Sequence, residues 1–103
     1  GEIVNFIENN YSRQLTLPEI AAQFGISESS LTKKIKIFTN MTFKEYLTKT
    51  RIEEAKSLLI SSEKSITEIA YECGYNNSNF FGDVFKKAVG MSPSSYRKML
   101  TKQ

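Results

Sequence analysis

The sequence contains no histidine and only one cysteine, Cys73, among its 103 residues. A disulfide within the chain requires two cysteines, and a structural zinc site requires about four cysteine or histidine ligands, so the sequence excludes both. It also excludes acid–base catalysis by histidine, and it gives Cys73 no partner base that would activate it as a nucleophile. A reducing, cytoplasmic compartment is consistent with so little cysteine.

Long apolar segments are also absent. No segment approaches the roughly 20 apolar residues of a membrane-spanning helix. The opening residues, GEIVNFIENN, are acidic and amphipathic, and they lack the basic start of a signal peptide. The first residue is Gly rather than Met, which suggests that the natural protein is longer. We therefore expect a domain that works in the cytoplasm and contacts no membrane.

Positive charge is concentrated in two segments, although the net charge is only +3. Residues 28–51 carry six basic and two acidic side chains, and residues 86–103 carry five basic side chains and no acidic one. The segments before each of them, 1–27 and 52–85, are net acidic. Two basic segments separated by acidic sequence indicate two contact points on a polyanion, but solvated helix faces would give the same pattern.

The periodicity of apolar residues predicts an all-α fold, because spacings near 3.6 residues fit almost everywhere and strict alternation is rare. Three Ser/Thr-x-x-Glu capping boxes mark helix starts, at Thr16, Thr42 and Ser65. Glycine or asparagine marks helix ends, at Gly25, Asn40, Gly74 and Gly90. Together with a helix near the N-terminus, the predicted helices lie at about 16–25, 28–38, 43–61, 65–74, 77–89 and from Ser92-Pro93 onward. Either Asn76 or Asn77 caps the helix that runs to about Val89.

The same order of signals occurs twice. Glu19-Ile20-Ala21 and Gly25 recur 49 residues later, and Lys36, Met41 and Tyr46 recur 50 residues later. The second copy therefore has one extra residue just after its glycine. Each copy contains a capped helix with a small residue at its centre, a glycine turn, and a second helix with apolar anchors. This is the pattern of a helix-turn-helix, although a generic helical hairpin is similar.

The segment Ile66–Tyr96, ITEIAYECGYNNSNFFGDVFKKAVGMSPSSY, resembles the signature of the AraC/XylS family of bacterial transcription regulators. Arg51–Leu59 resembles the linker helix of that family. The resemblance implies seven helices in two helix-turn-helix subdomains, at about 1–41 and 62–103, joined by a linker helix at about 42–61. It implies that the third and sixth helices are recognition helices in successive major grooves. It also implies a separate sensing or dimerisation domain, which this chain does not contain.

In the first unit, the start of the recognition helix is expected to face the groove. The family positions make Ser29, Thr32 and Lys33 the expected base contacts, with Lys33 able to reach guanine O6 and N7. Phosphate contact or simple exposure is the alternative for Lys33. We expect Lys36 to contact phosphate, whereas Lys34 is either a phosphate contact or a half-exposed substitution.

In the second unit, Ser78 and Asn79 are the corresponding base contacts. Asn79 is the strongest candidate because asparagine can pair bidentately with adenine, and a capping or solvent role is its alternative. Lys86, Lys87 and Arg97 are expected to contact phosphates. Arg51, on the linker helix, fits a structural tie as well as it fits a DNA contact.

Gly82 and Asp83 depart from the common pattern of the family, where a Ser/Thr–Arg pair is frequent. Gly82 either lets the backbone approach DNA closely or has no role. Asp83 could accept from cytosine N4. The spacing favours instead an intrahelical ion pair with Lys86 or Lys87. Both residues are included among the predicted base contacts.

The predicted function is sequence-specific binding of double-stranded DNA by both units, without a cofactor and without catalysis. Because members of the resembled family are mostly activators, we expect it to activate bacterial transcription, at the nucleoid and together with RNA polymerase. A helix of about 18 residues spans ~27 Å, near the ~34 Å of one DNA turn, so one chain could read a bipartite site. Two rival interpretations are a protein-interaction module and an accessory domain of a DNA-repair enzyme.

Overall fold

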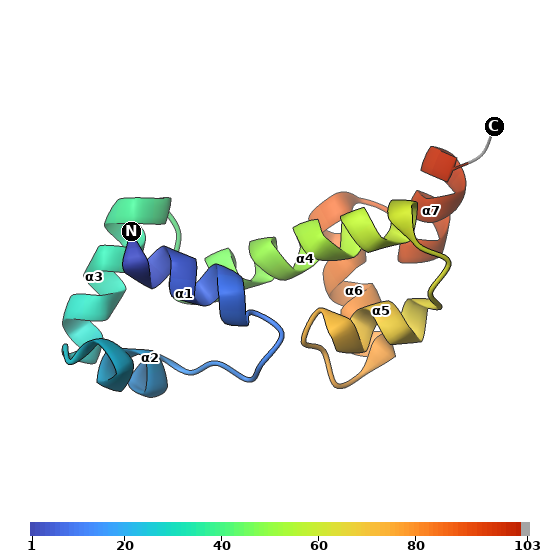
Figure 1. Cartoon of the computed structure of the whole chain (residues 1–103). Helices are drawn as coiled ribbons and strands as arrows, with labels where there is room; N and C mark the ends of the chain where they lie inside the picture. Colours follow the sequence, from blue (N-terminus) through green and yellow to red (C-terminus); the bar gives the residue numbers. More distant parts are fainter. Residues whose placement is uncertain (102–103) are drawn as a thin grey trace. The chain divides into compact units, whose positions relative to one another are not determined.

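The computed structural model describes residues 1–101, and within this range the regular elements are seven helices and no strand, as predicted (Figure 1). They are α1 (Glu2–Asn10), α2 (Leu17–Phe24), α3 (Glu28–Thr39), α4 (Phe43–Ser61), α5 (Ile66–Glu72), α6 (Ser78–Val89) and α7 (Pro93–Thr101). None of these helices combines the length and the apolar composition needed to cross a membrane.

The chain divides into two compact units, and the boundary between Thr50 and Arg51 lies inside α4. The predicted linker helix is therefore part of both units. Leu47, before the boundary, belongs to the core of the first unit. Ile52, Ala55 and Leu59, after the boundary, belong to the core of the second.

The first unit has an aliphatic core. Ile7 of α1, Ile20 of α2, and Leu31 and Ile35 of α3 are completely buried. Leu47 of α4 closes this core. The side chain of Tyr46 donates a hydrogen bond to the carboxylate of Glu8, which connects α4 to α1. Burial, followed by this bond, raises the pKa of Tyr46 to about 12.

The second unit has an aromatic core. Phe81 and Phe85 of α6 are completely buried, with their ring centroids 5.8 Å apart. The ring centroids of Tyr75 and Phe81 are 5.4 Å apart, and the rings of Tyr96 of α7 and Phe85 form a T-shaped pair with centroids 5.6 Å apart. Cys73 is also fully buried in this core, and burial raises the pKa of its thiol to about 12. The thiol is therefore protonated at neutral pH and acts as a small apolar residue.

The predicted helix starts are confirmed at the level of individual hydrogen bonds. Ser65 and Glu68 form a complete capping box, because each side chain accepts from the other residue's backbone N–H. Thr42 and Glu45 make the same reciprocal pair. Ser27, Asn77 and Ser92 cap α3, α6 and α7.

One predicted box is wrong in part. Thr16 accepts from the backbone N–H of Glu19, as expected. The carboxylate of Glu19, however, pairs with the guanidinium of Arg13 and not with the backbone of Thr16. Arg13 lies in the loop before α2, within reach of the same exposed carboxylate, and its charge competes with the neutral backbone donor.

The two helix-turn-helix turns close with the same backbone bonds. Ile26 N donates to the carbonyl of Ala21 at 3.0 Å, and Tyr75 N donates to the carbonyl of Ala70 at 2.9 Å. Ile26 and Tyr75 are 49 residues apart, so the two copies are still in register at this point. The next helix cap is Ser27 in the first copy and Asn77 in the second. The extra residue of the second copy is therefore Asn76, between the turn and the cap.

Candidate nucleic-acid interface

The second helix of the first unit, α3, has one buried stripe and one exposed polar stripe. Leu31 and Ile35 are completely buried. Ser29, Lys33 and Lys36 are exposed and follow one another at i, i+4 and i+7, which places them on one face away from the core. This face begins next to the Ser27 cap, at the end of the helix where the backbone N–H groups favour anions.

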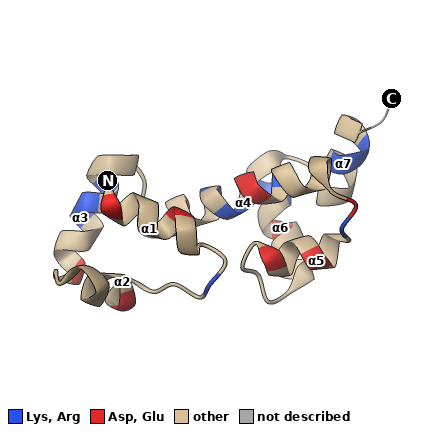
Figure 2. Cartoon of the chain, viewed as in Figure 1, with Lys and Arg blue, Asp and Glu red and all other residues tan. Residues whose placement is uncertain are grey.

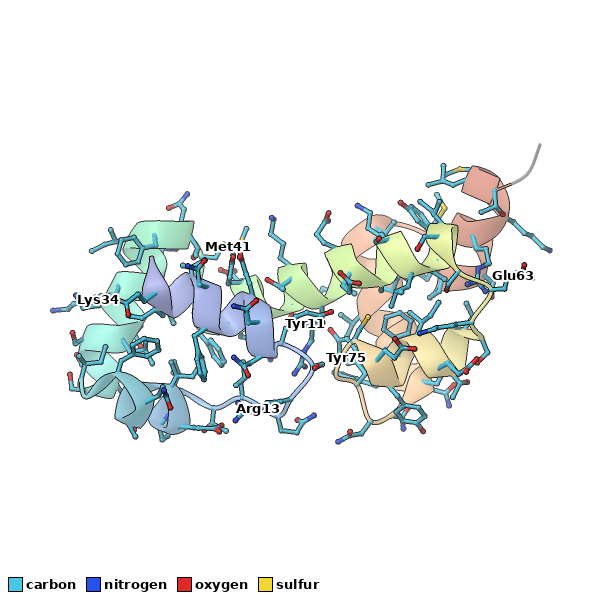
Figure 3. All side chains as sticks on the ribbon, viewed as in Figure 1. Tyr11, Arg13, Lys34, Met41, Glu63 and Tyr75 are labelled. Carbon is cyan, nitrogen blue, oxygen red and sulfur yellow. The ribbon has the colours of Figure 1, made fainter. Side chains whose placement is uncertain are left out.

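The other predicted contacts of α3 flank this stripe. Thr32 and Lys34 are both exposed. The side chain of Lys34 points outward from α3 (Figure 3). Lys34 therefore offers a cation that solvent, or a phosphate, can reach, and both interpretations of this residue stay open.

The second helix of the second unit, α6, repeats this arrangement. Phe81 and Phe85 form its buried stripe. The exposed stripe at i, i+4, i+7 and i+8 consists of Asn79, Asp83, Lys86 and Lys87. Ser78 is only partly exposed, and its hydroxyl lies 3.4 Å from that of Thr67 on α5.

Asp83 is not paired as the spacing predicted. It forms no ion pair with Lys86 or Lys87 among the interactions of residues 1–101, although both lysines are one turn away. The expected intrahelical pair is therefore absent, and the carboxylate is exposed to solvent. In the repeat, Asp83 occupies the position of Lys33, so the two units present opposite charges at equivalent sites.

Gly82 lies in α6 beside this stripe. A Cβ atom added to Gly82 would have no atom within 4 Å, and its φ lies outside the left-handed region. Neither packing within the protein nor backbone conformation therefore requires glycine here.

Arg97 of α7 binds the protein itself. Its Nε donates to the carbonyl of Leu59 at 2.9 Å, and its Nη2 donates to the carbonyl of Ser62 at 3.1 Å. These carbonyls belong to the last turn of α4 and the residue after it, where no helical N–H is available. The guanidinium therefore caps the C-terminal end of α4. Because it is engaged there, we leave Arg97 out of the proposed phosphate contacts.

Arg51 also has a partner inside the second unit. Its guanidinium carbon lies 5.3 Å from the centre of the Tyr75 ring. Burial lowers the pKa of Arg51 from its usual value. The contact ties α4 to the residue that follows the turn after α5, which favours the structural interpretation of Arg51.

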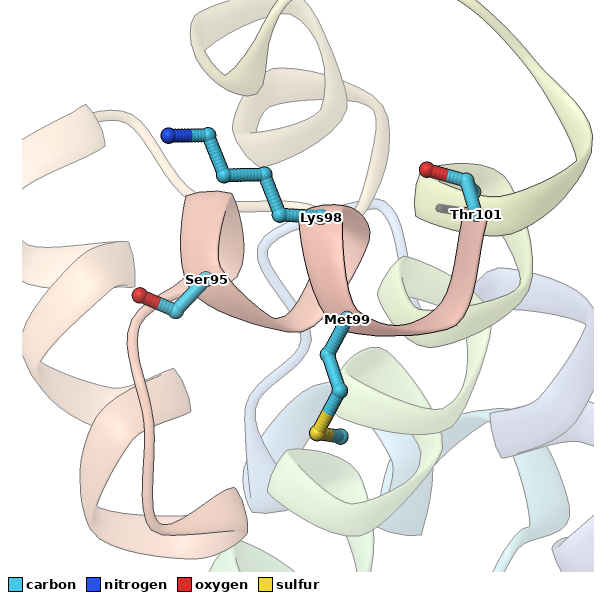
Figure 4. Close-up of a pocket in the computed structure, with 4 residues that line it drawn as sticks. All are labelled: Ser95, Lys98, Met99 and Thr101. Carbon is cyan, nitrogen blue, oxygen red and sulfur yellow. The ribbon is translucent and has the colours of Figure 1, made fainter. Parts of the chain in front are cut away.

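Both signs of charge occur on the helices of both units. Figure 2 shows Lys and Arg on α3, α4 and α7, and Asp and Glu on α1, α2, α4 and α5. A pocket on α7, lined by Ser95, Lys98, Met99 and Thr101, lies apart from the stripes of α3 and α6 in the sequence (Figure 4).

Both recognition helices also carry large apolar side chains that are exposed to solvent. Phe80 of α6 is 59% exposed, and Ile37 and Phe38 of α3 are 76% and 56% exposed. Phe80 is adjacent to the buried Phe81, and helical periodicity alone places neighbouring residues on different faces. The exposure of Phe80 could therefore have been predicted from helical periodicity.

The comparison with known proteins agrees with this geometry. The profile of a helix-turn-helix domain family matches residues 20–99. The transcriptional activator RhaS of Yersinia pestis is 36% identical over 99 residues, which are 96% of this chain and 36% of that protein. An uncharacterized helix-turn-helix regulator of Pseudoalteromonas carrageenovora is 42% identical over 93 residues, which are 90% of this chain and 55% of the relative. The chain thus spans about half or less of these relatives.

Solved structures share the fold. The C-terminal domain of AraT, a response regulator from Geobacillus stearothermophilus, has a TM-score of 0.91 and 37% identity, covering 95% of this chain and 82% of that one. The DNA-binding domain of AdpA, solved in complex with a target DNA, has a TM-score of 0.89 over 95% of this chain and 88% of that one, with 24% identity. At that identity the likeness to AdpA shows the fold alone. With the repeated turns, the seven helices and these matches, the chain belongs to the AraC/XylS family of helix-turn-helix transcription regulators and forms a DNA-binding domain of that family.

Proposed function

We propose that the chain reads double-stranded DNA with α3 and α6, each inserted in a major groove, with the two grooves successive along the duplex. One observation carries this proposal: both copies of the helix-turn-helix present an exposed polar stripe on the second helix, opposite its buried stripe. An α-helix fits the major groove, where the base edges differ from one another. The proposed base contacts are Ser29, Thr32, Lys33, Ser78, Asn79, Gly82 and Asp83. The proposed phosphate contacts are Lys34, Lys36, Lys86 and Lys87.

The proposed role in the longer protein is activation of bacterial transcription. The relative RhaS is named as an activator, and this chain corresponds to 36% of its length. We propose that a preceding sensing or dimerisation domain and RNA polymerase are the protein partners. A regulator of chromosomal genes would act in the cytoplasm, at the nucleoid. We also propose the subdomain limits of about 1–41 and 62–103, with a linker helix at about 42–61.

A selection of bound sequences from a random duplex pool tests the proposal. At ~150 mM salt, screening weakens contacts that depend on charge alone, so enrichment reports mainly sequence reading. We expect two enriched blocks about one helical turn apart. Lys33→Ala should relax the preference in one block, and Asn79→Ala should relax it in the other. Each lost contact should cost about 1–3 kcal/mol of discrimination between bases.

Lys56→Ala is the matched control, because Lys56 is a lysine of α4 that pairs with Glu53 and lies on neither recognition helix. This variant should leave both blocks unchanged. A single enriched block would contradict base reading by the second unit and would favour the rival protein-interaction role for it, in line with the unpaired carboxylate of Asp83. No enrichment would refute sequence reading by this chain.

A further inference from the structure

We propose that α6 reads two neighbouring pyrimidines, a thymine through its methyl group against Phe80 and a cytosine through its N4 amino group bound to Asp83. This inference rests on the proposed insertion of α6 in the major groove and specifies the bases that it recognises there. It adds Phe80 to the residues that determine specificity.

Phe80 is a large apolar side chain left exposed in the first turn of α6. Its backbone N–H donates to the cap Asn77 at 2.9 Å, so the helix start fixes its position. One side of its ring lies against Tyr75, with centroids 6.0 Å apart, and 59% of the residue is exposed. Tyr75 is itself buried against Phe81. The exposed ring is therefore supported from behind and available to an apolar group in front.

The thymine methyl is the apolar group that the major groove offers. It projects from the base edge, and phenylalanine is among the side chains that contact it. Covering both surfaces removes apolar area from water, which is favourable without any hydrogen bond.

Asp83 lies three residues after Phe80, so the two side chains are neighbours on the helix surface. An ionised carboxylate only accepts hydrogen bonds. Within the described residues, Asp83 forms no ion pair with a lysine of α6. Cytosine N4 and adenine N6 both present amino donors in the major groove, but adenine places its N7 acceptor beside N6, where it repels a carboxylate. Guanine and thymine present carbonyl oxygens, which repel it as well. Cβ atoms at this spacing are ~5–6 Å apart, which matches contacts to adjacent or nearly adjacent base pairs with a rise of ~3.4 Å.

The equivalent residues of the first unit have different chemistry. Ser30, which corresponds to Phe80, is half-buried, and Lys33 corresponds to Asp83. A lysine favours the guanine acceptors that Asp83 rejects. The two units would thus prefer different bases, and the full site would not be a palindrome.

Substitution of deoxyuridine for thymine tests the methyl contact, because it removes only the methyl group. In the duplex recovered by selection, each thymine of the block read by α6 is replaced in turn. At one position we expect the wild-type chain to lose affinity about fourfold, the factor for one buried methyl group. Phe80→Ala should bind the thymine duplex correspondingly more weakly and should show no further loss with deoxyuridine.

Asp83→Asn tests the cytosine contact, because an amide both donates and accepts. At one neighbouring position this variant should reduce the preference for C·G over T·A by about tenfold. Met99→Ala is the control for Phe80→Ala, since Met99 is a similarly exposed apolar residue of α7 (56%) and should keep the deoxyuridine effect. Thermal unfolding should be nearly unchanged for Phe80→Ala, which excludes loss of the fold as the cause.

The outcomes separate the two proposals. A selected site whose deoxyuridine penalty is the same in wild type and Phe80→Ala would overturn this inference and leave the proposed function intact. A preference for C·G over T·A that Asp83→Asn does not change would also overturn this inference and leave the proposed function intact. Failure to select any site would overturn the proposed function and this inference with it.

Discussion

At the scale of single residues, Gly82 has no structural reason to be glycine. It is helical and its missing Cβ would meet open space. We expect Gly82→Ala to raise the free energy of unfolding by up to about 1 kcal/mol, because alanine loses less backbone entropy in a helix. Urea unfolding followed by far-UV circular dichroism measures the change.

Gly90→Ala is the matched control for this prediction. Gly90 also has open space around its missing Cβ, but its φ is +94°. The same substitution should therefore destabilise the chain there, by about 1 kcal/mol. If Gly82→Ala stabilises the protein while weakening DNA binding, glycine serves close approach to the duplex. If binding is unchanged, the glycine has no part in the interface, and Gly82 leaves the set of proposed contacts.

The hydrogen bonds that could be predicted from the sequence are those whose two partners are close in the chain. Ser65 and Glu68 satisfy each other across one turn, and no other residue is needed to predict them. Asp83 shows the limit of the same logic, since a spacing of three or four residues permits an ion pair but does not require one. Exposed pairs of this kind contribute only ~0.3–0.5 kcal/mol, too little to fix a side chain against solvent.

At the scale of helices, the two complete capping boxes make stability depend on pH. The backbone hydrogen bonds from Thr42 and from Ser65 lower the pKa of Glu45 and of Glu68, respectively. A carboxyl with a lower pKa in the folded state stabilises the fold above its ordinary pKa of 4.5 and loses that contribution as the pH falls through its folded pKa. We expect urea midpoints to fall between about pH 5 and pH 3.

The double variant Glu45→Gln/Glu68→Gln should flatten this acid dependence, because glutamine does not titrate. Glu63→Gln, outside both boxes, is the control and should keep the dependence. Equal slopes in the double variant and in the wild type would show that other carboxyl groups cause the acid sensitivity.

Arg97 stabilises the end of α4. Arg97→Ala removes two hydrogen bonds from a charged donor and leaves the carbonyls of Leu59 and Ser62 without this partner. We expect a loss of about 1.5–3 kcal/mol in the free energy of unfolding, measured by urea denaturation. The salt dependence of DNA binding should stay the same, whereas Lys86→Ala should reduce the slope of log K against log salt by ~0.9. A reduced slope in Arg97→Ala would restore its role as a phosphate contact.

The role of Arg97 could not be predicted from the sequence. Its two partners are 38 and 35 residues away, and only the folded backbone brings them to α7. A basic residue in a basic segment predicts a phosphate contact on composition alone, and nothing in the sequence indicates the backbone acceptors that Arg97 binds. Helix starts, by contrast, depend on side chains within one turn of the backbone groups that they cap.

At the scale of the whole molecule, the chain passes between its two units only through α4, next to the exposed residue Lys49. Lys49→Pro should interrupt this helix, because proline removes a backbone donor and clashes with the carbonyl four residues earlier. If both units bind one duplex, the second binding step is intramolecular, and a stiff, continuous helix raises its effective concentration. The affinity for the bipartite site should then fall at least tenfold, toward that of a single block, in a fluorescence-anisotropy titration.

Lys49→Ala controls for loss of the lysine charge and should retain most of the affinity. Thermal unfolding of Lys49→Pro should still show a cooperative transition, since Leu47 and Ile52 lie on either side of the substitution. Equal affinities of the proline and alanine variants would contradict a role for helix continuity.

The repeat allowed the two-unit organisation to be predicted, because Ala21 and Ala70, and Gly25 and Gly74, serve the same turn twice. For the extra residue of the second copy, the sequence predicted only that it lies just after Gly74. Two asparagines, Asn76 and Asn77, were equally able to cap α6. The turn hydrogen bond of Tyr75 distinguishes them, because it keeps the copies in register up to that residue.

Because one core is aromatic and the other aliphatic, the two units contribute differently to the near-ultraviolet spectrum of the protein. The chain has no tryptophan, and the buried tyrosines Tyr75 and Tyr96 both pack against phenylalanine rings in the second unit. The buried residues of the first unit are aliphatic. Near-ultraviolet circular dichroism is therefore weighted toward the second unit, while the far-ultraviolet signal counts the helices of both. A comparison of the two melting curves would show whether the halves of this reader lose their structure together.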